Sequence, residues 1–404
     1  MAVSQFAGLE ERLGFWQAAM SLAVSMLGTG IVAFPYAFNL CGYLAGPAAL
    51  LLFGVLAILS YVSLIRCTAK MQVASYGDLL QNVPRAWSHY TNVALWLLLI
   101  LATTAYVIIS AHIIRRVTCK AMSISEEQAP IFLDNSLLFA IILALIFPLS
   151  LSKSFQGLSA VTTYCSAAII TVVVLIMGKA LSIYSSRKPP SDEEATASTD
   201  AKSVVLALPI LGCAMFGHMN ISQIYAELRP DVKPKANLMV FTAVAGCLVL
   251  YLGVGAAGYA TFGQEAEDDV VDQMAKGSGA IGVTLMIQAL LASFVMLKAP
   301  LLILPLRSLT FSLIAPSASL EDLSTRRYVA LTVVLLVCVY VAAMVLPELG
   351  KLLQILGAVS VVPLCFVVPA RLAWALEVPR PVLGCTLLAV VGVLTSICSL
   401  IALF

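Results

Sequence analysis

A run of small residues interrupts the first long apolar segment of the chain, at Gly28-Thr29-Gly30. The segment around it, residues 15–38, is long enough to cross a bilayer, which takes roughly 20 apolar residues. Inside a bilayer, a backbone group that leaves its helix finds no water, so a break persists only where it is buried in protein or lines a cavity. The feature therefore predicts a spanning helix that is broken where something binds.

The composition predicts an integral membrane protein, with the lipid bilayer as its main partner. The 404 residues are 61% hydrophobic and 11% charged, whereas soluble domains average about 45–50% apolar and about 25% charged residues. The net charge of +2 gives no indication of nucleic acid binding. We expect no cleaved signal peptide, because the first apolar run is too long for a signal core. Eleven runs read as spanning helices: 15–38, 43–66, 91–114, 136–152, 159–184, 203–226, 237–262, 279–306, 328–346, 350–374 and 382–403.

The placement of Lys and Arg predicts the orientation. If the N-terminus is cytoplasmic and the spans alternate, most basic residues fall in inner loops, and the acidic stretches at 192–194 and 265–269 fall outside. Cytoplasmic loops of membrane proteins carry such an excess of Lys and Arg. We therefore expect a multi-pass protein with a cytoplasmic N-terminus.

The second half of the chain repeats the interruption of the first. Its first span contains a run of small residues at 212–218, and Pro209 precedes it. Glycine that lets helices pack closely explains either break equally well, but interruptions at matching positions indicate a transporter built from inverted repeats. The expected organisation is a cytoplasmic N-terminus at 1–14, a first five-helix repeat at 15–184, an extramembrane linker at 185–202, a second five-helix repeat at 203–374 and an eleventh helix at 382–403.

Four groups of short motifs then stand in order along residues 14–372. They are Gly28-Thr29-Gly30-Ile31 with Pro35-Tyr36-Ala37, Ser75-Tyr76-Gly77-Asp78-Leu79, Phe216-Gly217-His218 with Ile224-Tyr225-Ala226-Glu227-Leu228, and Pro300 through Pro305-Leu306-Arg307. Together they resemble the amino acid/auxin permease family, which includes sodium-coupled and proton-coupled amino acid transporters. The resemblance implies an all-α integral membrane fold of eleven helices. Ten of them form two inverted five-helix repeats with discontinuous first and sixth helices, as in bacterial sodium-coupled leucine transporters.

An unwound helix offers partners for both charged groups of an amino acid substrate. N–H groups at the start of the outer half-helix form an anion site that the helix dipole strengthens, and glycine lets the backbone approach closely. We expect Gly28, Thr29 and Gly30 to hold the substrate carboxylate, while carbonyls freed near Ser25 and Phe216 receive its ammonium.

Side chains from the third and sixth spans are expected to shape the rest of the substrate pocket. The candidates are Tyr106, Cys213, Phe216 and Met219. For Tyr106 and Phe216, ordinary helix packing is an equal alternative.

His218 lies at membrane depth, where a polar residue is a functional candidate by default. An unperturbed pKa of about 6.5 suits histidine to proton coupling. The alternative is a neutral His218 that donates a hydrogen bond to an unwound carbonyl. Glu227, near the inner end of the same span, is expected to pair with Arg229 or Arg66.

Lys298 is a cation inside the eighth span, about nine residues before Arg307 and hence about 13 Å from the inner surface. The resemblance places it where sodium-coupled relatives supply hydroxyl oxygens to a cation, and those relatives tend to have Asn near the position of Val24. We hypothesise that the Lys298 ammonium replaces a sodium ion. The alternative is a lysine whose head snorkels to the interface. A proton-coupled symporter is thus favoured over a sodium-coupled one, with no cofactor or metal.

Secondary active transport of amino acids by alternating access is the favoured function. An amino-acid sensor of the same fold is the alternative, although only about 14 residues precede the first span and such sensors carry long tails. An enzyme is not expected, because no catalytic constellation or nucleotide loop is present. Plasma membrane and acidic organelle both stay open, and the sequence assigns neither the amino acid nor an oligomeric state.

Overall fold

The computed structural model is built from helices. It describes residues 12–73, 76–80, 85–124, 130–186, 201–267, 270–276, 281–315, 323–345 and 363–376, with isolated positions 320, 390, 393, 394 and 397. Most of the expected N-terminal segment, of the linker at 185–202 and of the eleventh helix at 382–403 lies outside these residues.

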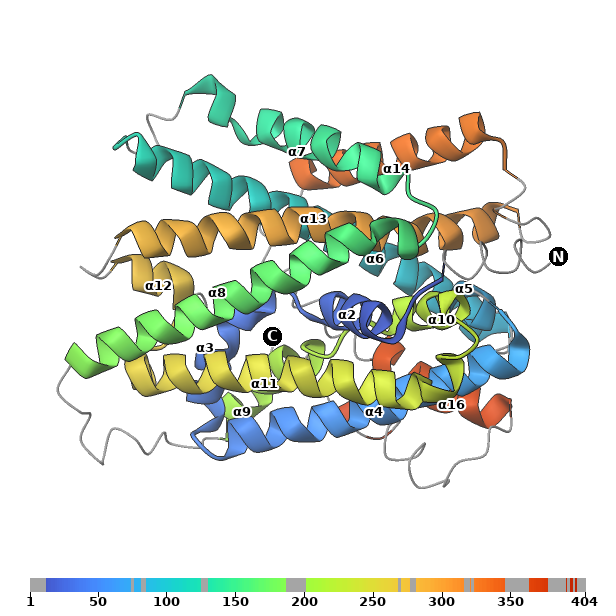
Figure 1. Ribbon diagram of the computed structural model, residues 1–404, viewed down its shortest axis with the longest axis horizontal. Coiled ribbons are helices and arrows are strands. Elements are labelled where there is room, and N and C mark those ends of the chain that lie inside the picture. Colours follow the sequence, from blue (N-terminus) through green and yellow to red (C-terminus); the bar gives the residue numbers. More distant parts are fainter. Residues whose placement is uncertain are drawn as a thin grey trace.

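The apolar runs of the sequence form helices in chain order (Figure 1). They are α2 (Phe15–Met26), η1 (Thr29–Ala33), α3 (Phe34–Cys41), α4 (Ala45–Met71), α5 (Tyr76–Leu80), α6 (Arg85–Ala121), η3 (Ile131–Leu133), α7 (Asn135–Ser150), η4 (Gln156–Leu158), α8 (Ser159–Ser186), α9 (Ala201–Cys213), α10 (His218–Glu227), η5 (Lys233–Lys235), α11 (Ala236–Phe262), η6 (Gly263–Glu265), α12 (Val270–Lys276), α13 (Ile281–Ile314), α14 (Thr325–Val345), the π-helical turn η9 (Pro363–Val367) and α16 (Val368–Ala375).

Within the described residues, six helices are long and apolar enough to cross a membrane, namely those built on α4, α6, α8, α11, α13 and α14. The α2–α3 pair makes a seventh candidate span, bent by 59° at its break. The apolar helices Asn135–Ser150 and Leu364–Ala375 are shorter. The third candidate span begins at Thr91 as expected but continues past residue 114 to Ala121, and the eighth continues past Arg307 to Ile314.

Both interrupted spans are broken where the small residues predict. α2 ends at Met26 before α3 begins at Phe34, and α9 ends at Cys213 before α10 begins at His218. The first half of one broken span, α2, packs against the second half of the other, α10, while α3 packs against α9 (Figure 1). The two broken spans therefore run side by side in opposite directions, and their breaks lie at the same level.

Long helices surround the two breaks. α11 packs against α2, α3, α4 and α8, and α13 packs along α6 and α8. α7 and α14 form an additional layer on α6 and α13, at the top of Figure 1. Side chains from α4, α6, α11 and α13 can therefore reach the breaks from several directions.

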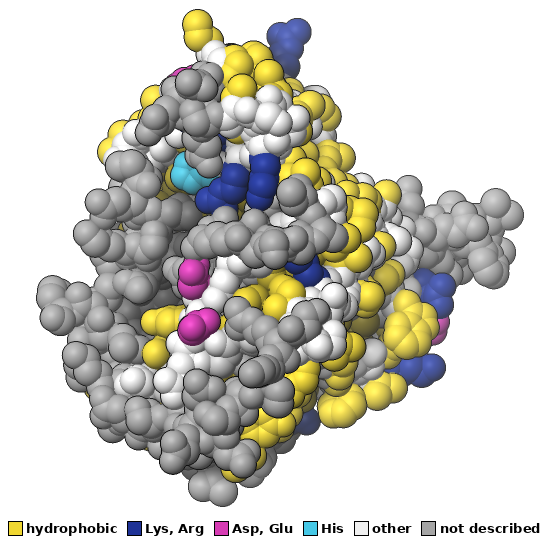
Figure 2. Space-filling view, turned by 90° about the vertical axis from the view of Figure 1, so that its left-hand side faces the viewer, with side chains coloured by type: hydrophobic (Ala, Val, Ile, Leu, Met, Phe, Trp, Pro, Cys, Tyr) yellow, Lys and Arg dark blue, Asp and Glu magenta, His cyan; other side chains and the backbone are white. Residues whose placement is uncertain are grey.

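The surface is apolar along the helices and polar at the end. Large hydrophobic side chains such as Leu52, Val174, Leu181, Phe241 and Val249 are exposed. Figure 2 looks onto the end of the molecule that lies at the left of Figure 1, where charged side chains and a histidine gather while hydrophobic ones cover a flank. This distribution suits helices that contact lipid along their length and water at their ends.

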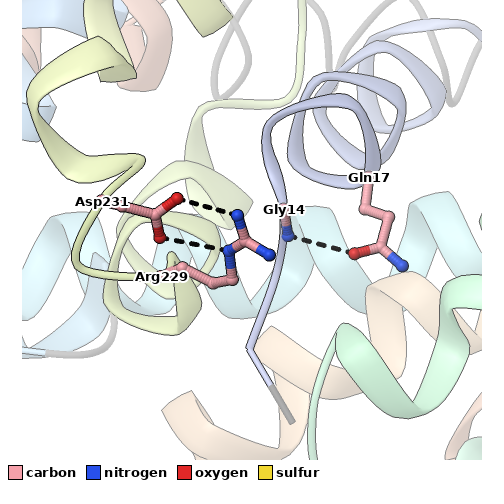
Figure 3. Close-up of polar contacts among 4 residues, drawn as sticks. All are labelled: Gly14, Gln17, Arg229 and Asp231. Carbon is pink, nitrogen blue, oxygen red and sulfur yellow. Dashed lines mark hydrogen bonds and ion pairs between the residues drawn. The ribbon is translucent and has the colours of Figure 1, made fainter. Parts of the chain in front are cut away.

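The chain before α2 is tied to the end of the second broken span. Leu13 N–H donates to Glu227 O (2.9 Å), and Arg229 N–H donates to Leu13 O (3.1 Å). Next to this crossing, Gly14 N–H donates to the Gln17 side chain (3.0 Å; Figure 3). The start of the first broken span and the end of the second are thereby joined through their backbones.

The Glu227 side chain caps another helix instead of pairing with a basic residue. Its two carboxylate oxygens accept from the N–H groups of Phe155 (3.1 Å) and Gln156 (3.0 Å), where η4 leads into α8. Arg229 forms a bidentate ion pair with Asp231 instead (2.8 and 3.2 Å; Figure 3). The expected pair of Glu227 with Arg229 or Arg66 is not found among the described residues, because unpaired N–H groups at a helix start attract a carboxylate.

Candidate functional site

The end of α2 leaves two carbonyl groups that face other helices. The Tyr251 hydroxyl from α11 donates to Met26 O (3.1 Å), and the Lys298 ammonium from α13 donates to Leu27 O. A helix C-terminus leaves its last carbonyls without intrahelical partners and carries partial negative charge. Side chains from two other helices satisfy this end of the first break.

The end of α9 is satisfied in the same way. Ala214 O accepts from the Tyr251 hydroxyl (2.9 Å), and Met215 O accepts from the Tyr61 hydroxyl of α4 (2.9 Å). These carbonyls lie in the region expected to receive the substrate ammonium. In the structure they are bonded to donors of the chain itself.

The N–H side of the first break is open. Among the described residues, no backbone hydrogen bond is found for the N–H of Gly28 or Gly30. Gly30 is exposed, and no atom lies within 4 Å of the place a Cβ would take. Beside Gly28, the same construction places Lys298 Nζ and the Tyr106 hydroxyl 3.7 Å away. Free donors, a cation and a phenol thus converge on the first break.

Lys298 is inside the protein and does not snorkel. Its side chain is 2% exposed, and it lies near the middle of α13, about 25 Å from either end at about 1.5 Å rise per residue. Its ammonium lies 5.3 Å from the centroid of the Tyr106 ring, within the range of a cation–π contact. The 13 Å estimate fails because Arg307 is buried and its guanidinium binds Ser150 O.

Val24 and Ser25, next to each other on α2, differ in what their side chains can bind. Val24 is fully buried and offers no side-chain oxygen. Because hard cations need oxygen ligands, the Val24 side chain cannot coordinate a sodium ion. The Ser25 hydroxyl donates to Ser21 O (2.8 Å) and accepts from the Asn220 amide (2.9 Å). Ser25 therefore ties the first broken span to the second.

His218 is the first residue of α10, and its side chain is 1% exposed. Its ring stacks on Tyr61, with centroids 4.0 Å apart and planes 10° apart, and it meets the Phe366 ring edge-on at 6.1 Å. Within the part of the chain that the structure describes, neither ring nitrogen has a hydrogen-bond partner. The expected bond to an unwound carbonyl is not found, and Met215 O already accepts from Tyr61.

The second break is closely packed at Gly217. A Cβ at this position would lie 2.9 Å from the Tyr61 hydroxyl and 3.3 Å from the backbone N of Met26. Glycine is required here because the two breaks touch. Of the other pocket candidates, Met219 is buried and Phe216 is half-buried, while the Cys213 side chain lies outside the described part, as does that of Thr29.

Sequence reasoning missed three residues of this site, namely Tyr61, Asn220 and Tyr251. Each is a hydrogen-bonding side chain within an apolar run, and polar groups at membrane depth are functional candidates. That rule alone is a weak signal, because Tyr61 and Tyr251 lie far in sequence from the breaks that they contact and belong to no motif shared with them.

Comparison with known proteins places the chain in a clear context. The model of a family described as "Transmembrane amino acid transporter protein" matches residues 11–379. Amino acid transporter AVT6E of Arabidopsis thaliana is 26% identical over 375 residues, covering 89% of this chain and 76% of the relative.

Two further relatives come from other kingdoms. Vacuolar amino acid transporter 5 of Schizosaccharomyces pombe is 22% identical, covering 89% of this chain and 84% of its own length. Sodium-coupled neutral amino acid symporter 2 of Danio rerio is 23% identical, covering 63% and 54% respectively.

A solved structure shares the fold. The crystal structure of MhsT in complex with L-phenylalanine superposes with a TM-score of 0.60, covering 96% of this chain and 98% of that one. The sequences are 13% identical, so this likeness concerns the fold alone.

Proposed function

Because the chain belongs to the transmembrane amino acid transporter family, we propose that it moves amino acids across a membrane by alternating access, as a secondary active transporter. The observation that supports this proposal most is the open N–H side of the first break, set level with a second break. Discontinuous helices of this kind form substrate sites near the bilayer midplane.

The substrate carboxylate binds at the N–H groups of Gly28, Thr29 and Gly30. Unpaired N–H groups at the start of a helical segment favour an anion, and those of Gly28 and Gly30 have no backbone partner among the described residues. Lys298 Nζ, 3.7 Å from the Cβ position of Gly28, adds a full positive charge beside them. The carbonyls near Ser25 and Phe216, in the region expected to receive the substrate ammonium, already accept from Tyr251, Lys298 and Tyr61, so the proposal rests on the carboxylate. Tyr106 lies beside the carboxylate.

Lys298 takes the place of a sodium ion, so that transport runs without sodium and is coupled to protons. Its ammonium lies on the carbonyl of Leu27 at the break, where the dipole of α2 favours a positive charge. The Val24 side chain supplies no oxygen that would help a sodium ion to bind.

The membrane arrangement completes the proposal. Eleven spans, ten of them in two inverted five-helix repeats, cross the plasma membrane or the membrane of an acidic organelle, with the N-terminus in the cytoplasm. The opposite directions of the two broken spans support the inverted repeat.

Uptake into proteoliposomes tests the function. The purified protein is reconstituted and offered a panel of labelled amino acids, with and without a pH gradient, in sodium chloride or choline chloride. We expect concentrative uptake of at least one amino acid, driven by the pH gradient and equal in both salts. Binding of an amino acid without flux would instead indicate a sensor, and uptake that needs sodium would contradict the role of Lys298.

A further inference from the structure

Tyr251 stands at the point where the ends of two helices meet. Its hydroxyl lies 3.1 Å from Met26 O at the end of α2 and 2.9 Å from Ala214 O after the end of α9. A phenol has a single proton, so this one donor is shared between the two broken spans. No other described side chain bonds to carbonyls of both breaks.

The position attracts positive charge. Carbonyl oxygens at the C-terminal ends of helices carry partial negative charge, and unwound carbonyls with half-helix C-termini are the groups that coordinate a monovalent cation in transporters with broken helices. Two such ends converge here from α2 and α9, and the chain supplies a hydroxyl proton in place of an ion.

The ring of Tyr251 is held so that its hydroxyl cannot leave. It is 1% exposed, and it stacks on the Phe34 ring at the start of α3, with centroids 4.5 Å apart and planes 9° apart. A ring packed in this way keeps the hydroxyl on the two carbonyls.

We infer that the Tyr251 hydroxyl permanently fills a position that would otherwise hold a monovalent cation between the two breaks. It is a second built-in donor, separate from the Lys298 ammonium, which serves the neighbouring carbonyl of Leu27. The consequence for transport rests on the proposed function. Because these donors occupy the described carbonyls of the two breaks, a sodium ion does not bind there and does not drive the transport cycle.

The test asks whether removal of the phenol creates a cation site. Tyr251→Ser opens space and keeps a small oxygen, and Tyr251→Phe keeps the ring and removes only the donor. The melting temperature of each purified full-length variant is measured in sodium, lithium and choline chloride at equal ionic strength. An ion that binds only the folded state raises the melting temperature.

We expect the wild-type protein to melt at the same temperature in all three salts. Both variants should melt lower than wild type in choline, and Tyr251→Ser should recover at least about 2 °C in sodium or lithium. Tyr251→Phe keeps the ring in place and leaves no space for an ion, so it should show no recovery in sodium or lithium. If the serine variant does not fold, Tyr251→Ala, which also opens the space, carries the same comparison.

Tyr61 provides the matched control. Its hydroxyl bonds to a single carbonyl, Met215 O, and its ring is also stacked, on His218. Tyr61→Phe and Tyr61→Ser should lower the melting temperature equally in every salt.

Two results would overturn the inference. One is equal melting, in all salts, of the folded variants that open the space, Tyr251→Ser and Tyr251→Ala, and the other is a sodium-specific rise in the wild-type protein. Absence of amino acid uptake by wild-type proteoliposomes would instead refute the proposed function, and it leaves the melting comparison intact because that assay needs no transport.

Discussion

The two helix breaks resemble each other in sequence but differ in the space around them. At the first break, Gly30 is exposed and no atom lies within 4 Å of its Cβ position. At the second, the Cβ position of Gly217 lies 3.3 Å from the backbone N of Met26 and 2.9 Å from the Tyr61 hydroxyl. Glycine leaves open space in one case and permits close packing in the other.

The carbonyl groups at the two breaks do not differ in this way, because side chains of the protein donate hydrogen bonds to carbonyls at both. Tyr251 serves both breaks, Lys298 serves the first and Tyr61 the second. The open donors lie on the N–H side of the first break, which suits an anionic group. The proposed carboxylate site therefore lies at the first break, while the second break is closely packed.

Of the substitutions considered, Lys298→Met should lower amino acid uptake the most. It removes the only cation described at the first break and leaves Leu27 O without its donor. We expect uptake efficiency to fall by about 100-fold, which corresponds to about 2.8 kcal/mol, measured as kcat/KM in proteoliposomes. Lys153→Met is the control, because Lys153 is exposed and its loss should leave uptake unchanged; an equal fall in both variants would contradict the role of Lys298.

Gly217→Ala tests the packed break. The added methyl group would press on the backbone of Met26, and overpacking of this kind costs about 1–3 kcal/mol of stability. Thermal unfolding of the purified protein measures this cost. A variant as stable as wild type would show that the breaks do not need their close approach.

Gly30→Ala is the matched test of the open break. Because the added methyl group meets no atom within 4 Å, we expect the free energy of unfolding to stay within about 0.5 kcal/mol of that of the wild-type protein. The methyl group would stand where the carboxylate approaches, so uptake efficiency should fall by about tenfold, or about 1.4 kcal/mol. Normal uptake by this variant would argue against carboxylate binding at Gly28, Thr29 and Gly30.

His218→Phe should raise the stability of the protein slightly. Phenylalanine keeps the stack on Tyr61 and removes two buried nitrogens that have no partner among the described residues. Stability should rise by about 1 kcal/mol or less, because an unsatisfied buried polar group is removed. Uptake driven by a pH gradient is measured in parallel: its loss with binding retained would assign proton coupling to His218, and normal coupling would exclude it.

Several features of the fold could be predicted because they are local. Apolar runs determine the spans, and small residues predicted both breaks, at residues 28–30 and 212–218. Local patterns failed where the outcome depends on a distant helix. Glu227 lies beside Arg229 in sequence, yet its carboxylate binds the start of α8, and Arg307 is buried against α7 although charge suggests a surface position.

The sequence by itself determined that the chain is a membrane protein and that two of its apolar segments are broken, at residues 28–30 and 212–218. Helix formation and its interruption depend on residues within a turn of each other. Only the tertiary structure decided what satisfies the breaks. Tyr251 and Lys298 reach Met26 and Leu27 from 225 and 271 residues away in sequence. A carbonyl that leaves its helix in a dry interior takes whatever donor helix packing brings to it, and no local pattern specifies which donor that is.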